Sequence, residues 1–461
     1  MKLWSKQNTP TSDLAASIER FTTGDDIAFD LLLAPFDVLG SIAHTRMLTK
    51  TELLSPEEGT QIIEHLRNIY SDIEAGRFII EAGVEDIHSE VELLLTRALG
   101  DTGKKVHSAR SRNDQVLLDL KLWLRHALQT IAEKTRNLAQ LLLQLSGQYQ
   151  NTLLPGYTHL QVAMPSSFGL WFAAYAEGFS EDLFTLEAAY RSANQNPLGS
   201  AAGYGSSLSI DRRLTTQLLG FDDLNWNVVY AQMTRGKTEK IAGFALAQIA
   251  STLSRLCMDI TLYMSQNFGF LSLPDHLTTG SSIMPHKKNP DVFELIRAFC
   301  NEMQGVPANI QYVIGNLPSG YHRDLQILKG QIMPAFSRLS DCLDMAMEML
   351  PELLIPKNIT ADPRYQYMFS VEAVNQLVKE GIPFRDAYRQ VGLEIEAGRP
   401  FGQFSADQQT DAAHLKHTHE GSLGNLCNAE ITEKLERAFA RFGFEKAAIM
   451  KNLVTDQPER L

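Results

Sequence analysis

A polar loop past the middle of the chain carries the residues best suited to chemistry. It spans residues 279–291 and reads TGSSIMPHKKNPD. Gly280 and Pro285 predict a loop, and Asn289 followed by Pro290 is typical of a capped helix start. Backbone N–H groups and the helix dipole favour an anion at such a start, so the hydroxyls and ammonium groups here could hold developing negative charge. A solvated loop whose lysines aid solubility is the alternative.

A second polar segment, residues 107–115, stands directly before the longest apolar pattern and reads HSARSRNDQ. Ser111, Asn113 and Asp114 are good helix N-caps, and the two arginines carry planar guanidinium groups that match carboxylates. Basic residues at a helix start oppose its dipole. That mismatch favours an anion site over simple capping, although capping alone also explains the polar residues.

Two further turns combine groups of chemical interest. Residues 155–161 read PGYTHLQ and place His159 beside the hydroxyl of Thr158. An imidazole suits proton transfer near neutrality, although a lone histidine is more often structural. Residues 318–329 read PSGYHRDLQILK and form a polar turn that enters a helix, which a plain surface turn would also explain.

Long helices must position these segments. From Val116 to Leu145 apolar residues recur at spacings of three and four without Pro or Gly, which predicts one helix. Similar patterns cover residues 169–193 and 238–267, and another helix begins after Pro290. Helices apolar on more than one face bury the extra surface against another chain, so we expect an oligomeric bundle. One large monomeric α domain is the alternative.

Shorter patterns flank these helices. Residues 56–70 form a short helical pattern before the bundle, and prolines 351 and 356 break the pattern after it. The sequence therefore predicts an all-α protein of three domains. These are an N-terminal helical domain at 1–110, a central long-helix bundle at 111–359 and a small C-terminal helical domain at 360–461.

Composition excludes several classes of protein. The 461 residues include 42 Lys and Arg against 54 Asp and Glu, a net charge of −12, which disfavours nucleic-acid or anionic-membrane binding. No leader-like segment or apolar run of spanning length appears, so a cytoplasmic location is expected. Four separated cysteines indicate neither a disulfide framework nor a zinc ribbon. Histidines 414, 417 and 419 make a weak metal site, and we predict no metal or cofactor.

Together the segments resemble a known family. Residues 280–290 are similar to the GSSxMPxKxNP loop of the fumarase/aspartase superfamily. Residues 111–115, SRNDQ, resemble the segment found in its argininosuccinate lyase branch, and residues 156–161, 321–326 and 381–385 agree with that branch. The resemblance covers nearly the whole chain. It implies a homotetramer with a twenty-helix core and active sites shared by three chains.

The resemblance also implies an activity and roles for individual residues. The activity is the reversible, cofactor-free cleavage of argininosuccinate to arginine and fumarate in arginine biosynthesis. Ser281 would remove the Cβ proton, Lys287 would stabilise the dianion that forms, and His159 with Glu294 would serve in acid–base chemistry. Asn289 would bind and stabilise the same dianion. Further substrate-binding roles fall on His88, Ser111, Arg112, Asn113, Thr158, Tyr321, Gln326 and Lys329.

The chain departs from the family pattern at several positions. Asp26 stands where a substrate-binding serine is expected, and residues 225–239 lack the usual Asp-Ala-x-Ser-x-Arg-Asp pattern. The other departures are Val162, Met164, His286, His322, Ile327 and Leu328. They leave the residues for forming fumarate intact and concern the amine half of the substrate.

Two alternatives from the same scaffold remain. A related lyase with another leaving group, such as adenylosuccinate lyase, is disfavoured by residues 111–115. A non-catalytic structural protein resembling the lens crystallins of this family is disfavoured by the presence of Ser281, Lys287, Asn289 and His159, because a purely structural role would not need them.

Overall fold

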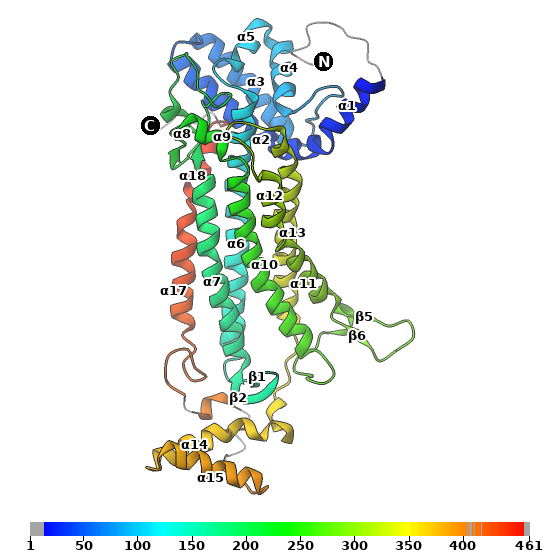
Figure 1. Cartoon of the computed structure of the whole chain (residues 1–461), viewed down its shortest axis with the longest axis vertical. Coiled ribbons are helices and arrows are strands. Elements are labelled where there is room, and N and C mark those ends of the chain that lie inside the picture. Colours follow the sequence, from blue (N-terminus) through cyan, green and yellow to red (C-terminus); the bar gives the residue numbers. More distant parts are fainter. Residues whose placement is uncertain (1–12, 403, 405–407, 410, 416, 456–461) are drawn as a thin grey trace.

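The fold is a long bundle of helices with a helical layer at each end (Figure 1). The computed structural model describes residues 13–402, 404, 408–409, 411–415 and 417–455. Five helices lie side by side along the bundle. They are α6 (Arg112–Gln148), α7 (Phe168–Ala193), α10 (Lys237–Tyr263), α13 (Leu328–Met349) and α17 (Asn428–Phe439). The predicted all-α fold class is confirmed.

Helix α6 is longer than its apolar pattern predicts. It has 37 residues and so runs about 55 Å at 1.5 Å per residue. It begins early because Ser111 caps it: the Ser111 hydroxyl accepts from the Asn113 N–H at 3.3 Å, and the Asp114 carboxylate accepts from the Ser111 N–H at 2.8 Å. The polar segment before the bundle therefore both caps the helix and places the side chain of Arg112 at its end.

Helices α11 (Asp291–Met303) and α12 (Val306–Ile314) pack against α10 and complete the core of the bundle. The core is formed by apolar side chains that face inward from α6, α7, α10 and α13. Leu124, Phe172, Leu246 and Leu339 are among its buried members, each at most 1% exposed. Burial of this continuous apolar stripe is the main force that holds the long helices together.

The N-terminal layer covers the upper end of the bundle in Figure 1 and has its own apolar cluster. Its helices are α1 (Asp13–Thr23), α2 (Asp26–Lys50), α3 (Pro56–Glu74), α4 (Ile87–Leu99) and α5 (Asp101–Lys104). Three later helices lie at the same end: α8 (Arg212–Leu218), α9 (Val228–Met233) and α18 (Phe444–Lys451). Helix α2 is buried over most of its surface and contacts α3, α4 and α6.

The opposite end holds α14 (Ser370–Lys379) and α15 (Phe384–Glu396), which pack on each other. The predicted break at Gly381 and Pro383 is confirmed, because α15 starts directly after it. The chain then returns to the bundle, where α17 packs along α6 and α7. The domain boundaries at 110 and 359 remain predictions.

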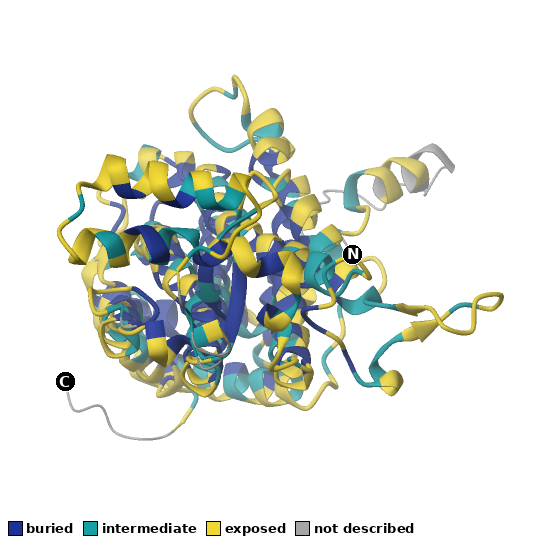
Figure 2. Ribbon diagram, turned by 90° about the horizontal axis from the view of Figure 1, so that it is seen from below, coloured by how far each residue is buried: buried dark blue, intermediate teal, exposed yellow. Residues whose placement is uncertain are grey.

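Three small two-stranded sheets accompany the helices. Strands β1 (Leu153–Thr158) and β2 (Gln161–Ser167) form an antiparallel hairpin after α6. Strands β3 (Gln195–Asn196) and β4 (Asp223–Leu224) are parallel. Strands β5 (Thr279–Gly280) and β6 (Lys288–Asn289) are antiparallel and carry a loop that projects from the side of the bundle and is exposed along most of its length (Figure 2).

The prediction that Asn289 caps a helix is wrong. Asn289 lies in β6, and α11 begins two residues later at Asp291, with Pro290 in the capping position and no side-chain cap. Strands β5 and β6 pair with each other, and the loop between them extends away from α11. The serines and the first lysine of the loop therefore lie out on the projecting hairpin, and α11 does not present them at its N-terminus.

Helices α2 and α10 are long and apolar enough, by length and composition, to cross a membrane. Their most apolar windows are, however, 67% and 56% buried inside the fold. Core helices satisfy the same criterion when their apolar surface faces other helices. Both helices therefore fit core positions in this bundle.

Helix α3 offers a local test of stability. The Ser55 hydroxyl accepts from the Glu58 N–H at 3.2 Å, and the Glu58 carboxylate accepts from the Ser55 N–H at 3.1 Å. Because Ser55→Ala removes one half of this capping box, we expect it to lower the free energy of unfolding by about 1 kcal/mol. Urea denaturation followed by circular dichroism measures the change, and Thr60→Ala, one turn further along the exposed face, is the matched control.

Candidate active site

A cleft of about 200 Å³ opens where the N-terminal layer meets the starts of α6 and α13. It is lined by both acidic and basic side chains, most of them already paired with one another. Six of the residues that the sequence singles out line it: His88, Arg112, Asn113, Tyr321, Gln326 and Lys329. Segments more than 200 residues apart in the sequence therefore meet here. Ser111 stands next to them as the cap of α6.

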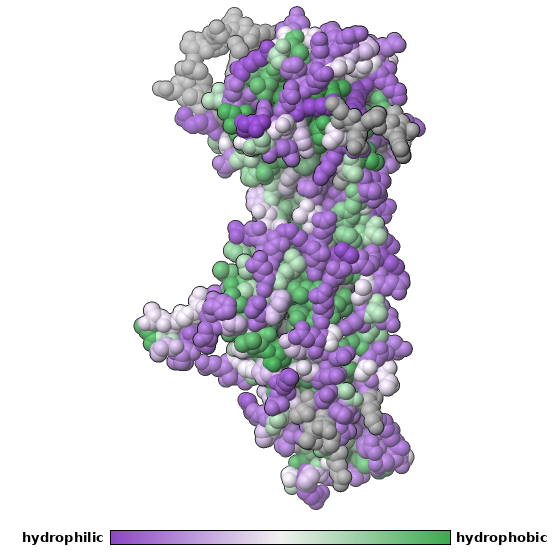
Figure 3. All heavy atoms as spheres, turned by 180° about the vertical axis from the view of Figure 1, so that it is seen from behind, coloured by the Kyte–Doolittle hydropathy of each residue, from purple (hydrophilic) through white to green (hydrophobic). Residues whose placement is uncertain are grey.

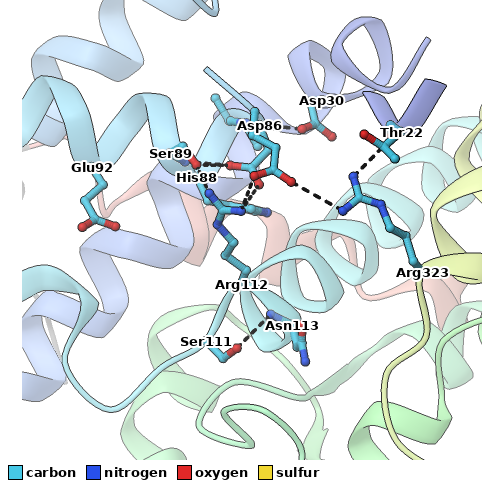
Figure 4. A network of polar contacts seen from close by, with 12 residues as sticks. Thr22, Asp30, Asp86, His88, Ser89, Glu92, Ser111, Arg112, Asn113 and Arg323 are labelled. Carbon is cyan, nitrogen blue, oxygen red and sulfur yellow. Dashed lines mark hydrogen bonds and ion pairs between the residues drawn. The ribbon is translucent and has the colours of Figure 1, made fainter. Parts of the chain in front are cut away.

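Arg112 is held by acidic and hydroxyl groups from the loop before α4 and its first turn (Figure 4). Its Nη1 lies 3.1 Å from Glu85 Oε2 and 3.4 Å from Asp86 Oδ2, and its Nη2 donates to the Ser89 hydroxyl. These partners fix the guanidinium at the edge of the cleft. The Arg112 side chain lines the cleft and is 33% exposed, so part of it stays accessible to a planar anion such as a carboxylate.

The short helix η3 (Arg323–Ile327) closes another side of the cleft. Gln326 Nε2 donates to the Thr22 carbonyl at 2.9 Å, and Arg323 Nη2 donates to the same oxygen at 3.1 Å. Arg323 Nη1 also lies 3.5 Å from Glu85 Oε1. The end of α1 is thereby tied to the turn before α13, and Figure 4 shows Arg323 between Thr22 and the acidic loop.

Lys329 is buried and shared between two carboxylates of α2. Its Nζ lies 2.5 Å from Asp30 Oδ1 and 2.8 Å from Asp26 Oδ1. Asp30 also accepts from the backbone N–H of Ile87 through Oδ2 at 3.2 Å. Burial raises the pKa of Asp26 above its ordinary value, while Lys329 opposes that rise. Asp26, a departure from the family pattern, therefore contacts Lys329, and two carboxyl groups surround one ammonium group here.

His88 lies deeper, against α2 and α6. Its Nδ1 is 2.8 Å from Asp37 Oδ1 and 3.5 Å from Asp119 Oδ2, and all three side chains are at least nine-tenths buried. Burial alone lowers the pKa of His88, but the two carboxylates outweigh it and raise the pKa to about 9. The ring is consequently an imidazolium at neutral pH. Asp37, His88 and Asp119 also form the cluster, among described residues, whose ligand atoms could surround a cation.

Thr158 and His159 lie at the tip of the β1–β2 hairpin and are exposed. His159 and Leu160 have φ angles of 53° and 55°, which makes a tight two-residue turn in the left-handed region. Residues other than glycine rarely adopt this backbone conformation, and such backbone strain is concentrated at functional sites. The turn leaves His159 exposed at the tip of the hairpin.

Ser281, Lys287 and Asn289 lie on the β5–β6 hairpin. The Ser281 hydroxyl accepts from the backbone N–H groups of Ile283 at 3.3 Å and Met284 at 3.1 Å. Asn289 Nδ2 donates to the Thr279 hydroxyl at 3.3 Å. The hairpin therefore presents Ser281 in a nest of backbone donors, and Lys287 is exposed beside it.

Glu294 lies on α11, with Arg297 Nη2 at 4.0 Å. Among the side chains that the structure describes, no contact joins it to His159, which the resemblance pairs with it. Both groups are exposed, so each is free to meet a group from outside its own chain.

A single chain does not bring together the cleft, His159 and the β5–β6 hairpin. The cleft is at the start of α6, while His159 follows its end, so about 55 Å of helix separates them. The β5–β6 hairpin projects from the bundle away from both (Figure 1). The predicted substrate-binding residues of the cleft thus meet within a chain, while the predicted catalytic residues lie on two distant hairpins and, for Glu294, on α11.

Sequence reasoning missed several charged residues of the cleft and its support. These are Asp30, Asp37, Glu85, Asp119 and Arg323. Asp37 and Asp119 carried a usable signal, because each places a charge within a helix face that is otherwise apolar and buried.

Comparison with known proteins identifies the family. A family model described as a lyase matches residues 13–305. The chain is 56% identical, over 444 residues and 96% of each chain, to an argininosuccinate lyase of Bacteroides fragilis. The chain belongs to the argininosuccinate lyase family. A protein of the same name from Bacteroides thetaiotaomicron is likewise 56% identical over 443 residues and 96% of each chain.

A solved structure supports the fold of this family member. The crystal structure of EDDS lyase in complex with formate matches with a TM-score of 0.70 over 94% of this chain and 91% of that one. The two sequences are 22% identical, so the likeness concerns the fold alone. The resemblance drawn from the sequence motifs is confirmed by the family model and the sequence relatives.

Proposed function

We propose that this chain catalyses the reversible cleavage of argininosuccinate to arginine and fumarate in arginine biosynthesis. The observation that carries this proposal is the 56% identity, over 96% of the chain, to proteins named argininosuccinate lyase. The cleft supports it, because argininosuccinate carries carboxylates together with cationic groups, and the cleft lines up charges of both signs. An enzyme of this family acts on a small molecule.

The cleft suits the two kinds of charge on this substrate. Arg112 and Asn113 at the start of α6 offer donors to a carboxylate. Asp26 and Asp30 place two carboxyl groups around the one ammonium group of Lys329, so they suit the ammonium group of the arginine end. Tyr321 and Gln326 line the same cleft and complete the proposed binding set.

The chemistry falls to the residues on the hairpins. Ser281, as an alkoxide, takes the proton from the Cβ of the succinyl group, and its electron pair passes into the adjacent carboxylate. Lys287 and Asn289 stabilise the second negative charge that develops there. The electron pair then forms the carbon–carbon double bond of fumarate as the Cα–N bond breaks. The departing nitrogen takes a proton from His159, paired with Glu294, or from a water that His159 positions.

A serine hydroxyl is a weak base unless its surroundings favour the alkoxide. The Ser281 oxygen already accepts from two backbone N–H groups. These donors, together with the ammonium group of Lys287, favour the negatively charged form. No step of this scheme draws on a cofactor.

The proposed site requires several chains. About 55 Å of α6 separates the cleft from His159, so residues of other copies must complete it. Large apolar side chains are exposed along the bundle, including Phe184 on α7, Phe244 and Met258 on α10 and Leu295 on α11. Figure 3 shows hydrophobic surface along the bundle between its ends. These features support a homotetramer whose sites are shared between chains.

We further propose that the protein works in the cytoplasm without nucleic-acid or membrane partners. The net charge of −12 gives no general attraction to phosphate backbones or anionic lipid surfaces. In α2 and α10, which are long and apolar enough to cross a membrane, most of the apolar window is buried inside the fold.

Fumarate release tests the activity. Purified protein is given argininosuccinate and, separately, adenylosuccinate, and the ultraviolet absorbance of fumarate is followed. We expect release from argininosuccinate alone. Release from adenylosuccinate alone would assign the chain to the other leaving group. A folded tetramer that releases fumarate from neither would support a structural role like that of the crystallins, or another amine.

A further inference from the structure

His88 has two buried carboxylate neighbours, which is more than a residue that only binds substrate needs. Its ring is enclosed by the layer of α2, α4 and α6, and it reaches the cleft only at one edge. Asp37 accepts from Nδ1 at 2.8 Å, and Asp119 lies 3.5 Å from the same nitrogen. Two buried carboxylates on one ring nitrogen are costly to place in a core, so they call for a reason beyond packing.

A second observation concerns the Oδ2 oxygen of each carboxylate, which in Asp119 is the oxygen that lies 3.5 Å from His88 Nδ1. Asp37 Oδ2 and Asp119 Oδ2 are buried, and neither has a hydrogen-bond partner within the part of the chain that the structure describes. Asp119 therefore acts on the His88 ring through its charge alone, whereas Asp37 also accepts a hydrogen bond from the ring. Removal of either charge leaves the ring with less to hold it.

A divalent cation is the competing occupant of this cluster, and the local charges disfavour it. The guanidinium of Arg110 acts on both Asp37 and Asp119. Burial and the neighbouring Asp37 raise the pKa of Asp119, while His88 and Arg110 oppose that rise. These two cationic groups already face the carboxylates, so a divalent ion would add further positive charge to a buried site. The 2.8 Å separation of Asp37 Oδ1 and His88 Nδ1 is that of a charge-assisted hydrogen bond.

We propose that Asp37 is a positioning residue of this enzyme. Together with Asp119 it fixes the His88 ring, so that the second ring nitrogen of His88, Nε2, donates a hydrogen bond to a carboxylate of the substrate in the cleft. The inference rests on the proposed function. Hydrogen bonding at one ring nitrogen sets the orientation and the tautomer at the other. Asp119 supplies a second charge that keeps the ring from turning away.

Other charged groups around the His88 ring also affect its protonation. Asp86 precedes α4 and favours the imidazolium, and Asp30 of α2 acts on Asp119. Arg110, before α6, lowers the pKa of Asp119 and so favours its charged form. Asp37 is the partner at hydrogen-bond distance, so its loss should have the largest effect on the ring.

The test is a double-mutant cycle of Asp37→Asn and His88→Gln, with kcat/KM for fumarate release from argininosuccinate as the readout. We expect Asp37→Asn to lower kcat/KM about 10- to 100-fold, the range found for groups that orient a functional histidine from behind. In the His88→Gln background the same change should cost less than about threefold, because the residue acts through the ring.

The pH profile gives a second readout that a structural role would not move. In the wild type the imidazolium form is lost as pH rises through the pKa of His88, about 9, so kcat/KM should fall there. Without the Asp37 charge the pKa of the ring drops toward its ordinary value, so the fall in kcat/KM should move to lower pH. Asp182→Asn is the matched control: Asp182 is a buried carboxylate of α7 that accepts from Gln248 at 3.1 Å, and its loss should leave the profile in place.

Equal losses from Asp37→Asn in the two backgrounds, with an unmoved pH profile, would overturn the role of Asp37. Stoichiometric Zn²⁺ binding that Asp37→Asn abolishes would overturn it too, since it would make the cluster a metal site. Circular dichroism and light scattering establish that each variant is a folded oligomer. A folded wild type that releases no fumarate from argininosuccinate contradicts the proposed function itself, whereas additive losses in an active enzyme contradict only this inference.

Discussion

Replacing Ser281 with alanine is expected to lower kcat for fumarate release about 10²- to 10⁴-fold, the usual contribution of a general base. The proton beside a carboxylate is weakly acidic, and the variant has no oxygen at this position to accept it. Lys287 and Asn289 would remain in place, so binding of the substrate should change little. The expected loss therefore falls on kcat and leaves KM within a small factor.

The structure gives reason to expect that this variant folds. The Ser281 hydroxyl accepts from two backbone N–H groups of an exposed hairpin, and water can replace both bonds. Ser272→Ala is the matched control, because it removes the same hydroxyl from an exposed residue outside the hairpin. Steady-state kinetics with argininosuccinate measures both variants. Turnover by Ser281→Ala within tenfold of the wild type would assign the base to another group.

The bundle was predictable because its helices have strong apolar periodicity. The pattern over residues 169–193 matches α7 to within one residue, and that over 238–267 matches the start of α10. The end of α10 at Tyr263 falls four residues earlier than predicted. A turn follows Tyr263, and the chain reverses so that the Phe270 N–H donates to the Tyr263 carbonyl. Such reversals depend on long-range contacts that a local pattern does not contain.

The candidate site was predictable in its residue types and less so in its arrangement. Motif resemblance selected six residues that line one cleft, although they come from three distant segments. The β5–β6 pair is only two residues long on each side, so no alternating pattern could indicate it, and Asn289 was assigned to a helix cap instead. Nor does the sequence alone show that Asp26 faces Lys329, because that pair joins residues about 300 positions apart.

The shared site predicts that two inactive variants restore each other. Ser281→Ala disables the β5–β6 hairpin, and Asn113→Ala removes an amide that lines the cleft at the other end of the bundle. Each variant alone should be nearly inactive or strongly impaired. When the two are co-expressed, a site that takes its hairpin from one chain and its cleft from the other is intact. Random mixing should then restore about a quarter of the sites in a symmetric tetramer.

The measurement is the fumarate-release rate of mixed tetramers, purified through a different tag on each variant. The matched control pairs Ser281→Ala with Lys287→Ala, which lie on the same hairpin. Every hairpin in that mixture is defective, so activity should stay at the level of the single variants. Recovery confined to the first mixture requires the cleft and the hairpin of one site to come from different chains. No recovery in tetramers shown to contain both chains would mean that the hairpin serves the cleft of its own chain, which would require it to move far from the position seen along the side of the bundle.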